Sequence, residues 1–405
     1  MQSFNLVAKT LYGLEEVLAR ELEMIGAQEI KPLNRAVMYR GDLEVMYKSN
    51  LLLRTAQKIL RPIRTFEVQN ENQLYKKLQQ INWPGFFHVD QTFAVDGTTQ
   101  GNIFTHSKYV ALRTKDAIVD QFRDRLGKRP SVDIDHPDIR INIHISDMRC
   151  TVSMDSSGVQ LGRRGYRAMQ VEAPISETLA AGIILLSGWK GQKPFLDPMC
   201  GSGTFPIEAA MIAANIPPGR MHEFAFENWK DYDDKLWKRI QKEVDSYIKP
   251  IDVDIRGMDM DADAVKIASQ NAKYAGVDKW VRFGVNNFLE NTPEMKPGTI
   301  IVNPPYGERL KEKDEIVPFY QEIGTRLKHH YNGWEAWIVS GNVEALKFIG
   351  LRPAKKVKLY NGPLESRLDK YELYRGSKKD GGKPGGHRNE RSERNKFNRN
   401  DRNRR

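Results

Sequence analysis

A short loop after a strand of β-branched residues carries the first groups that could do chemistry. Thr299–Leu310 reads TIIVNPPYGERL, and proline cannot donate to a sheet ladder, so the strand must end at Asn303. Each residue before a proline is also held extended. The loop is therefore stiff and presents one amide, Asn303, and one aromatic ring, Tyr306. Such a loop at the end of a buried strand is a candidate ligand-binding element.

A glycine-containing loop forms a second candidate. In FLDPMCGSGT, between a predicted strand and helix, Gly201 and Gly203 let the backbone turn tightly and approach a ligand closely. Asp197, at the strand end, can accept hydrogen bonds from a ligand amine or hydroxyl. The loop lacks the lysine of a phosphate-binding P-loop, and its pattern is G-x-G rather than G-x-G-x-x-G. A ligand with an amino-acid or nucleoside portion fits better than a triphosphate.

Polar side chains also follow the next two strands. Asp259 ends the strand in GMDMD and could hold two ribose hydroxyls, whereas Asp261 is better explained as a helix cap. An insertion, Pro217–Pro250, separates Asp259 from the glycine loop. Asn286 and Asn287 follow the third strand, where an adenine edge could be read, and we assign that role to Asn287. Because ligands of open α/β sheets lie beyond the carboxyl ends of the strands, one crevice is expected to hold Asp197, Asp259, Asn287 and Asn303.

Over about residues 175–375 these motifs resemble the class I S-adenosylmethionine-dependent methyltransferases that act on exocyclic amines of bases. The resemblance implies S-adenosylmethionine as cofactor and a base held by hydrogen bonds to Asn303 and the Pro304 carbonyl, with Tyr306 stacked on it. The catalytic loop would comprise Asn303, Pro304, Pro305 and Tyr306. Cofactor binding would fall to Asp197, Pro198, Cys200, Gly201, Gly203, Thr204, Asp259, Asn287 and Asn303.

The N-terminal portion resembles the THUMP-domain RNA methyltransferases, through GNIFTHSKYVALRTKDAIVDQF and LGRRGYR…APISETLAAGI. This implies an RNA partner and, most closely, the bacterial 23S rRNA guanine-N2 methyltransferases. Family members often carry Asp where Asn287 stands, although an Asn carbonyl can still meet the adenine amine. A tRNA guanine-N2 enzyme, an adenine-N6 enzyme and a non-catalytic ribosome assembly factor are the alternatives. Bifunctional members carry a second methyltransferase domain, and here we expect one activity only.

Hydrophobic periodicity places these motifs in an α/β chain. We expect an N-terminal α+β ferredoxin-like module at 1–65, a THUMP RNA-binding domain at 66–160 and a linker at 161–174. From 175 to 375, helices alternate with short apolar strands, which predicts a Rossmann-like parallel sheet, of seven strands by the resemblance. The last two strands, in AKKVKLYNG and DKYELYR, lack a helix between them and predict an antiparallel hairpin at one edge. Residues 376–405 are expected to be a disordered basic tail.

Composition excludes several classes of protein. The 405 residues are 40% hydrophobic and 28% charged, which is ordinary for a soluble protein of two or three domains. No apolar stretch is long enough to cross a bilayer, and the N-terminus lacks a secretory signal, so we expect a cytoplasmic protein. Two cysteines, Cys150 and Cys200, make neither a disulfide framework nor a zinc cluster, and we expect no metal. Oligomeric state cannot be read from this sequence.

Two groups of cations are candidate RNA contacts. The helix predicted in SKYVALRTKDAIVDQFRDRLG carries Lys108, Arg113 and Lys115, although by themselves these charges are better explained as a solvated helix face. The resemblance to THUMP proteins favours RNA. The linker segment LGRRGYR combines cations with a stacking ring and adds Arg163, Arg164 and Arg167.

The basic tail gives the first prediction. Residues 376–405 hold 11 Lys and Arg against 4 Asp and Glu and have almost no aliphatic side chains, so they cannot fold alone. Deleting them should weaken RNA affinity and flatten its dependence on salt, because each cation that neutralises a phosphate releases counterions. Filter binding at several salt concentrations measures this slope. An unchanged slope would make the tail a solvated segment with no part in RNA binding.

Overall fold

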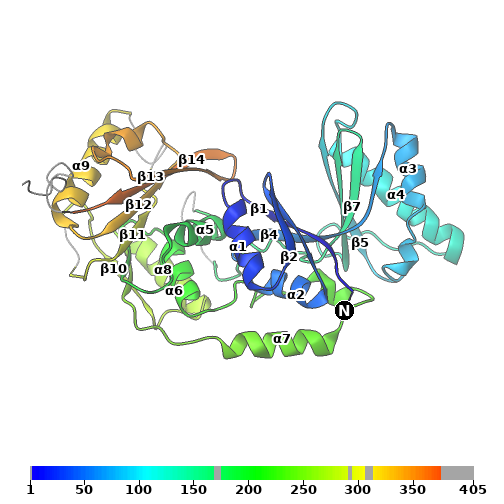
Figure 1. Cartoon of the computed structure of the whole chain (residues 1–405), viewed down its shortest axis with the longest axis horizontal. Helices are drawn as coiled ribbons and strands as arrows, with labels where there is room; N and C mark the ends of the chain where they lie inside the picture. Colours follow the sequence, from blue (N-terminus) through cyan, green and yellow to red (C-terminus); the bar gives the residue numbers. More distant parts are fainter. Residues whose placement is uncertain (1, 168–174, 291–293, 306–312, 375–405) are drawn as a thin grey trace, which may run out of the picture.

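The computed structural model describes residues 2–167, 175–290, 294–305 and 313–374. These residues form two seven-stranded sheets, one in each half of the chain. In Figure 1 the N-terminal half, blue to cyan, lies on the right, and the C-terminal half, green to orange, lies on the left. Helices pack against both sheets, so the predicted α/β class is confirmed.

The first sheet joins both N-terminal modules. Its strands are β1 (Phe4–Thr10), β2 (Gln28–Leu33), β3 (Ala36–Gly41), β4 (Ala56–Glu67), β5 (Phe93–Gln100), β6 (Ile139–Ser146) and β7 (Arg149–Asp155), in the order β2-β3-β1-β4-β7-β6-β5. β4 pairs antiparallel with β7, from Leu60 opposite Asp155 to Glu67 opposite Arg149. The two modules therefore share one continuous sheet. The expected boundary at residue 65 falls inside β4, and the domain boundaries stay predictions.

Helices cover this sheet and close its core. They are α1 (Glu15–Met24), α2 (Leu43–Leu52), α3 (Glu71–Gln79), the 3₁₀ turn η1 (Trp83–Gly85) and α4 (Ser107–Leu126). Side chains of Asp42 and Asn70 cap α2 and α3 by accepting backbone N–H bonds. α4 ends at Gly127, whose φ of 69° is readily adopted only by glycine. Its buried face, which includes Val110, Ile118 and Phe122, packs into the core under the sheet.

The second sheet is parallel apart from one edge. Its strands are β8 (Phe195–Asp197), β9 (Ile255–Asp259), β10 (Val281–Val285), β11 (Thr299–Val302), β12 (Glu335–Ser340), β13 (Lys355–Asn361) and β14 (Leu364–Glu372), in the order β10-β9-β8-β11-β12-β14-β13. β14 pairs antiparallel with both β12 and β13. The predicted antiparallel hairpin at one edge is confirmed.

The helices of the second half are α5 (Glu177–Ser187), α6 (Thr204–Ala213), η2 (Ala225–Asn228), α7 (Asp234–Ser246), α8 (Ala262–Tyr274), α9 (Lys313–His330) and η4 (Ala345–Ile349). Helices join β8 to β9, β9 to β10 and β11 to β12, as parallel neighbours in a sheet require crossover connections. Within the described ranges, no helix has the length and apolarity needed to cross a membrane.

A segment between α6 and β9, residues 217–250 and called the insertion below, joins the two halves. In Figure 1 its helix α7 runs along the lower side of the molecule and lies against α2. The ring of Phe226 stacks on that of Tyr47, with 4.4 Å between centroids, and the Asp233 N–H donates to the Tyr47 hydroxyl over 2.9 Å. The first core therefore contains four aromatic residues from the second half of the chain: Phe224, Phe226, Trp229 and Trp237.

Candidate functional site

A pocket of about 480 Å³ lies at the carboxyl edge of the second sheet, where β8, β9, β10 and β11 end. It is lined by Pro198, Met199, Gly201, Asp259, Met260, Asn286, Asn287, Phe288, Leu289, Asn303, Pro305 and Phe319. Ligands of parallel α/β sheets bind at this edge. Six residues singled out from sequence meet here: Pro198, Gly201, Asp259, Asn287, Asn303 and Pro305.

The glycine loop after β8 is held by the strand beside it. The Gly201 N–H donates to Oδ2 of Asp259 over 2.8 Å. Gly203 has a φ of 82°, and a Cβ there would lie 2.9 Å from the Cβ of Ala268. Only glycine permits both the turn and this close approach to α8. The other carboxylate oxygen of Asp259 accepts from the Asp261 N–H over 3.0 Å, so Asp259 fixes the loop and still has lone pairs for a ligand.

The two asparagines after β10 have different roles. Oδ1 of Asn287 accepts the Leu289 N–H over 3.0 Å and so stabilises the turn. Oδ1 of Asn286 is buried and has no hydrogen-bond partner among the described residues. A buried acceptor without a partner is costly and is commonly satisfied by a ligand or water. Asn286 was not chosen from the sequence, because two adjacent asparagines are distinguished only by the turn that follows them.

The residues between β11 and α9 bring the stiff loop to the pocket. Asn303 and Pro305 are half-buried in its wall, and Pro304 is buried behind them. Tyr306 lies outside the described residues. The extended geometry that the prolines impose thus holds the Asn303 amide at the same pocket as Asp259 and Asn286.

Other predicted cofactor residues support the loop instead of lining the pocket. Asp197 is buried, and its Oδ1 accepts the Met199 N–H over 3.2 Å. Burial, with a smaller effect from the charge of Asp259, raises the pKa of Asp197 well above its usual range. Cys200 is buried as well, and burial raises the pKa of its thiol. The Thr204 hydroxyl accepts from Arg167 over 2.9 Å. The structure does not place the side chains of Asp197, Cys200 and Thr204 on the pocket wall.

The cations on α4 differ in how far contacts within the protein already engage them. Lys108 is exposed. The guanidinium of Arg113 lies 4.3 Å from the ring centroid of Tyr75, and Lys115 pairs with Asp116 over 2.7 Å. RNA contact by these residues stays a prediction.

The expectation of RNA contact is wrong for Arg164. Its side chain is 1% exposed and donates to the carbonyl oxygens of Leu161 and Arg54 over 2.8 and 2.5 Å. Its Nε lies 3.5 Å from Oε1 of Glu208, which is fully buried. The guanidinium therefore compensates a buried carboxylate, and cannot reach solvent. Arg167 is also engaged within the protein, with Nη2 bonded to the Ile175 carbonyl and Thr204, whereas Arg163 is exposed.

Among the described residues, no group of three or more His, Cys, Asp or Glu side chains is arranged to hold a metal ion.

The chain matches three protein-family models in succession. Residues 5–60 match the RlmL ferredoxin-like domain. Residues 68–155 match the THUMP domain, and residues 164–370 match the RMKL-like, methyltransferase domain.

Individual proteins that are similar over most of this chain are methyltransferases by name. A Synechocystis sp. protein named as RNA methyltransferase slr0064 is 38% identical over 364 residues, which cover 89% of this chain and 95% of that protein. The ribosomal RNA large subunit methyltransferase K/L of Syntrophotalea carbinolica is 39% identical over 374 residues, 89% of this chain; the chain spans about half, 52%, of that relative. A crystal structure of SMU.472, described as a methyltransferase complexed with SAH, has a TM-score of 0.84 and 33% identity, covering 93% of this chain and 100% of that one.

The buried ion pair gives a stability prediction. Arg164→Ala should lower the free energy of unfolding by about 3–5 kcal/mol, because it leaves Glu208 buried without its cation. Arg163→Ala, at the exposed neighbour, is the matched control and should change it by no more than about 0.5 kcal/mol. Urea unfolding followed by tryptophan fluorescence measures both. If Arg164→Ala had wild-type stability and weaker RNA binding, the structural role of Arg164 would be contradicted and its predicted RNA contact supported.

Proposed function

The chain belongs to the RMKL-like methyltransferase family, with RlmL-type ferredoxin-like and THUMP modules, and from this membership we propose that it methylates the exocyclic N2 amine of a guanine in 23S ribosomal RNA. Membership makes it an S-adenosylmethionine-dependent RNA methyltransferase; the guanine, the N2 position and the 23S substrate are our proposal. One observation carries it: Asn303, fixed by two prolines, lines the same pocket as Asp259 and Asn286.

The pocket has suitable groups for S-adenosylmethionine. Oδ1 of Asn286, buried and without a partner among the described residues, can accept a hydrogen bond from the adenine amine. Asp259 keeps lone pairs for the ribose hydroxyls. Gly201 leaves the wall free of a side chain where the ligand would approach, and Gly203 permits the turn that follows it. When bound, S-adenosylmethionine supplies an electrophilic methyl group on its sulfonium.

Asn303 is suited to the target amine. The lone pair of an aryl amine is delocalised into the ring, so the amine is a poor nucleophile. The Asn303 side-chain oxygen and the Pro304 carbonyl would accept its two N–H bonds and aim it at the methyl group, and such positioning can supply much of the rate. Asn303 is neutral and a weak base, so the proton would leave to solvent after transfer. We place the reaction in the cytoplasm, where ribosomal RNA is assembled.

The identity of the methylated nucleoside tests this proposal. Full-length protein is incubated with labelled S-adenosylmethionine and total RNA from a strain that lacks the gene, and the RNA is fractionated and digested to nucleosides. We expect N2-methylguanosine in large-subunit rRNA. The same product in tRNA would contradict the substrate and preserve the chemistry. N6-methyladenosine would contradict the assignment of the base, and no transfer to any RNA would contradict the proposal as a whole.

A substitution at the loop tests the role of its amide. Asn303→Ala should lower kcat by about 100-fold or more, by analogy with the loss of one hydrogen bond to a reacting group, and leave the Kd for RNA within twofold. Asn34→Ala, at an exposed asparagine in the turn between β2 and β3, is the control and should retain wild-type rates. Parallel losses of RNA affinity and of methylation in Asn303→Ala would show that the amide binds RNA and does not aid transfer.

A further inference from the structure

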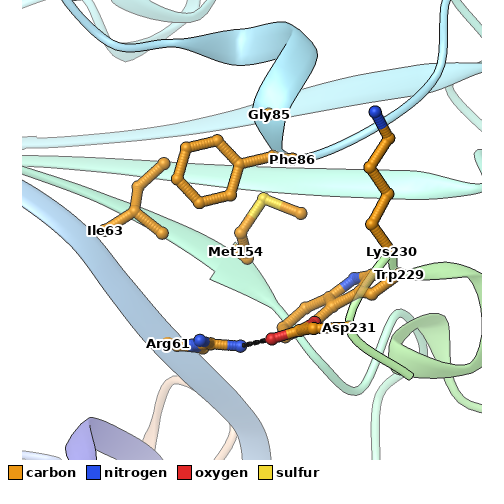
Figure 2. Close-up of a pocket in the computed structure, with 8 residues that line it drawn as sticks. All are labelled: Arg61, Ile63, Gly85, Phe86, Met154, Trp229, Lys230 and Asp231. Atoms are coloured by element: carbon orange, nitrogen blue, oxygen red, sulfur yellow. Dashed lines mark hydrogen bonds and ion pairs between the residues drawn. The ribbon is translucent and has the colours of Figure 1, made fainter. Parts of the chain in front are cut away.

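Another pocket lies between the N-terminal half and the insertion, and shares no lining residue with the pocket at the edge of the second sheet. Its volume is about 140 Å³. Figure 2 shows side chains from four separate segments of the chain arranged around one space: Arg61 and Ile63 on β4, Met154 on β7, Phe86 after η1, and Trp229 to Asp231 after η2. The pocket exists only because the insertion lies against the first sheet.

The walls of this pocket combine rings with a fixed cation. The guanidinium of Arg61 lies 4.0 Å from the ring centroid of Phe4 and 6.0 Å from that of Trp229. It is also held by Asp231 over 2.5 Å, the dashed contact in Figure 2. Lys230 is exposed, and its Nζ donates to the Pro84 carbonyl over 2.7 Å. A planar aromatic ligand that carries negative charge nearby would meet complementary groups here.

One group in the wall lacks a partner. Trp229 is 6% exposed, and its Nε1–H is buried with no hydrogen-bond acceptor among the described residues. Buried indole N–H groups usually find an acceptor, because leaving one unpaired is costly. The missing partner is therefore an acceptor that the ligand would bring, such as a ring nitrogen or carbonyl oxygen of a base.

We propose that this pocket receives one unpaired base of the RNA substrate. The inference rests on the proposed function. It gives the RNA a second contact with the protein, away from the methylated nucleotide. Proteins that read RNA sequence stack unpaired bases on aromatic side chains and hydrogen-bond their edges. Phe86 supplies the ring for stacking, Trp229 Nε1 supplies the donor, and the exposed Lys230 supplies a cation for a flanking phosphate. The pocket is too small for a helix and suits a single ring.

Two conservative substitutions in the full-length protein separate these contacts. Trp229→Phe keeps an aromatic ring and removes the donor; Phe86→Leu keeps an apolar side chain and removes the ring. We expect Trp229→Phe to raise the Kd and the KM for large-subunit RNA about threefold to tenfold, the effect of one buried hydrogen bond. Phe86→Leu should raise them about tenfold or more, the effect of one lost base stack. The kcat at saturating RNA should stay within twofold for both.

Trp280→Phe and Phe348→Leu are the matched controls, because they make the same changes at residues of the second half that do not line this pocket. Both should bind and methylate RNA like the wild type. Thermal unfolding of all four variants establishes that they are folded. Should Phe86→Leu fail to fold, Trp229→Phe, which preserves the ring, carries the test alone.

Photo-crosslinking locates the base directly. Large-subunit RNA transcribed with 4-thiouridine is irradiated with the protein, and crosslinked peptides are identified by mass spectrometry. We expect peptides that contain Phe86 or residues 229–231. Wild-type Kd and KM in both variants, while Asn303→Ala is inactive, would overturn this inference and preserve the proposed function. RNA affinity that depends on Trp229, without N2-methylguanosine as product, would preserve the base pocket and overturn the proposed function.

Discussion

Aromatic side chains from the second half of the chain pack into the core of the first half. This packing fixes how the two sheets lie relative to each other. Phe226 stacks on Tyr47, and Trp237 packs edge-on against both rings. Large rings of this kind bury much apolar surface each and contribute strongly to a core. Because they come from the insertion, the sheet that carries the THUMP module and the pocket for methyl transfer are held in one orientation. The first sheet and the pocket at the edge of the second sheet are thereby held at a set distance from each other.

Buried polar groups reinforce the same junction. Arg164 joins the carbonyl of Arg54, between α2 and β4, to the carboxylate of Glu208 on α6. The Tyr166 hydroxyl donates to the same carboxylate over 3.1 Å. Arg54 in turn donates to the carbonyls of Met211 and Ile216. Pairs of this kind add little net stability compared with apolar packing, yet they penalise every arrangement that leaves a charge unpaired. Apolar packing thus stabilises the junction, and the buried polar groups select one arrangement of the two halves.

The sequence predicted those features that local chemistry determines. Two consecutive prolines directly after a buried strand end it, and a glycine-containing turn after a strand is recognised from a few residues, so the positions of Asn303, Gly201 and Asp259 could be predicted. Features that depend on contacts between segments distant in the sequence could not be predicted. The pairing of β4 with β7, the burial of Arg164 against Glu208 and the pocket around Trp229 all join residues that no short pattern connects. The sequence did not distinguish the roles of Asn286 and Asn287, because a single turn decides which amide oxygen has no hydrogen-bond partner among the described residues.

The pairing of β4 with β7 also sets the order in which the protein can be completed during synthesis. The chain leaves the ribosome N-terminus first, so β4 pairs with β1 while its other edge waits for β7. An open strand edge is a template for pairing with other chains. Arg61, Pro62 and Arg64 are among the β4 residues that stay unpaired until β7 has been synthesised. Charged residues and proline on a strand edge discourage pairing with other chains. The side chains at the centre of this sheet thus also protect the nascent chain from aggregation.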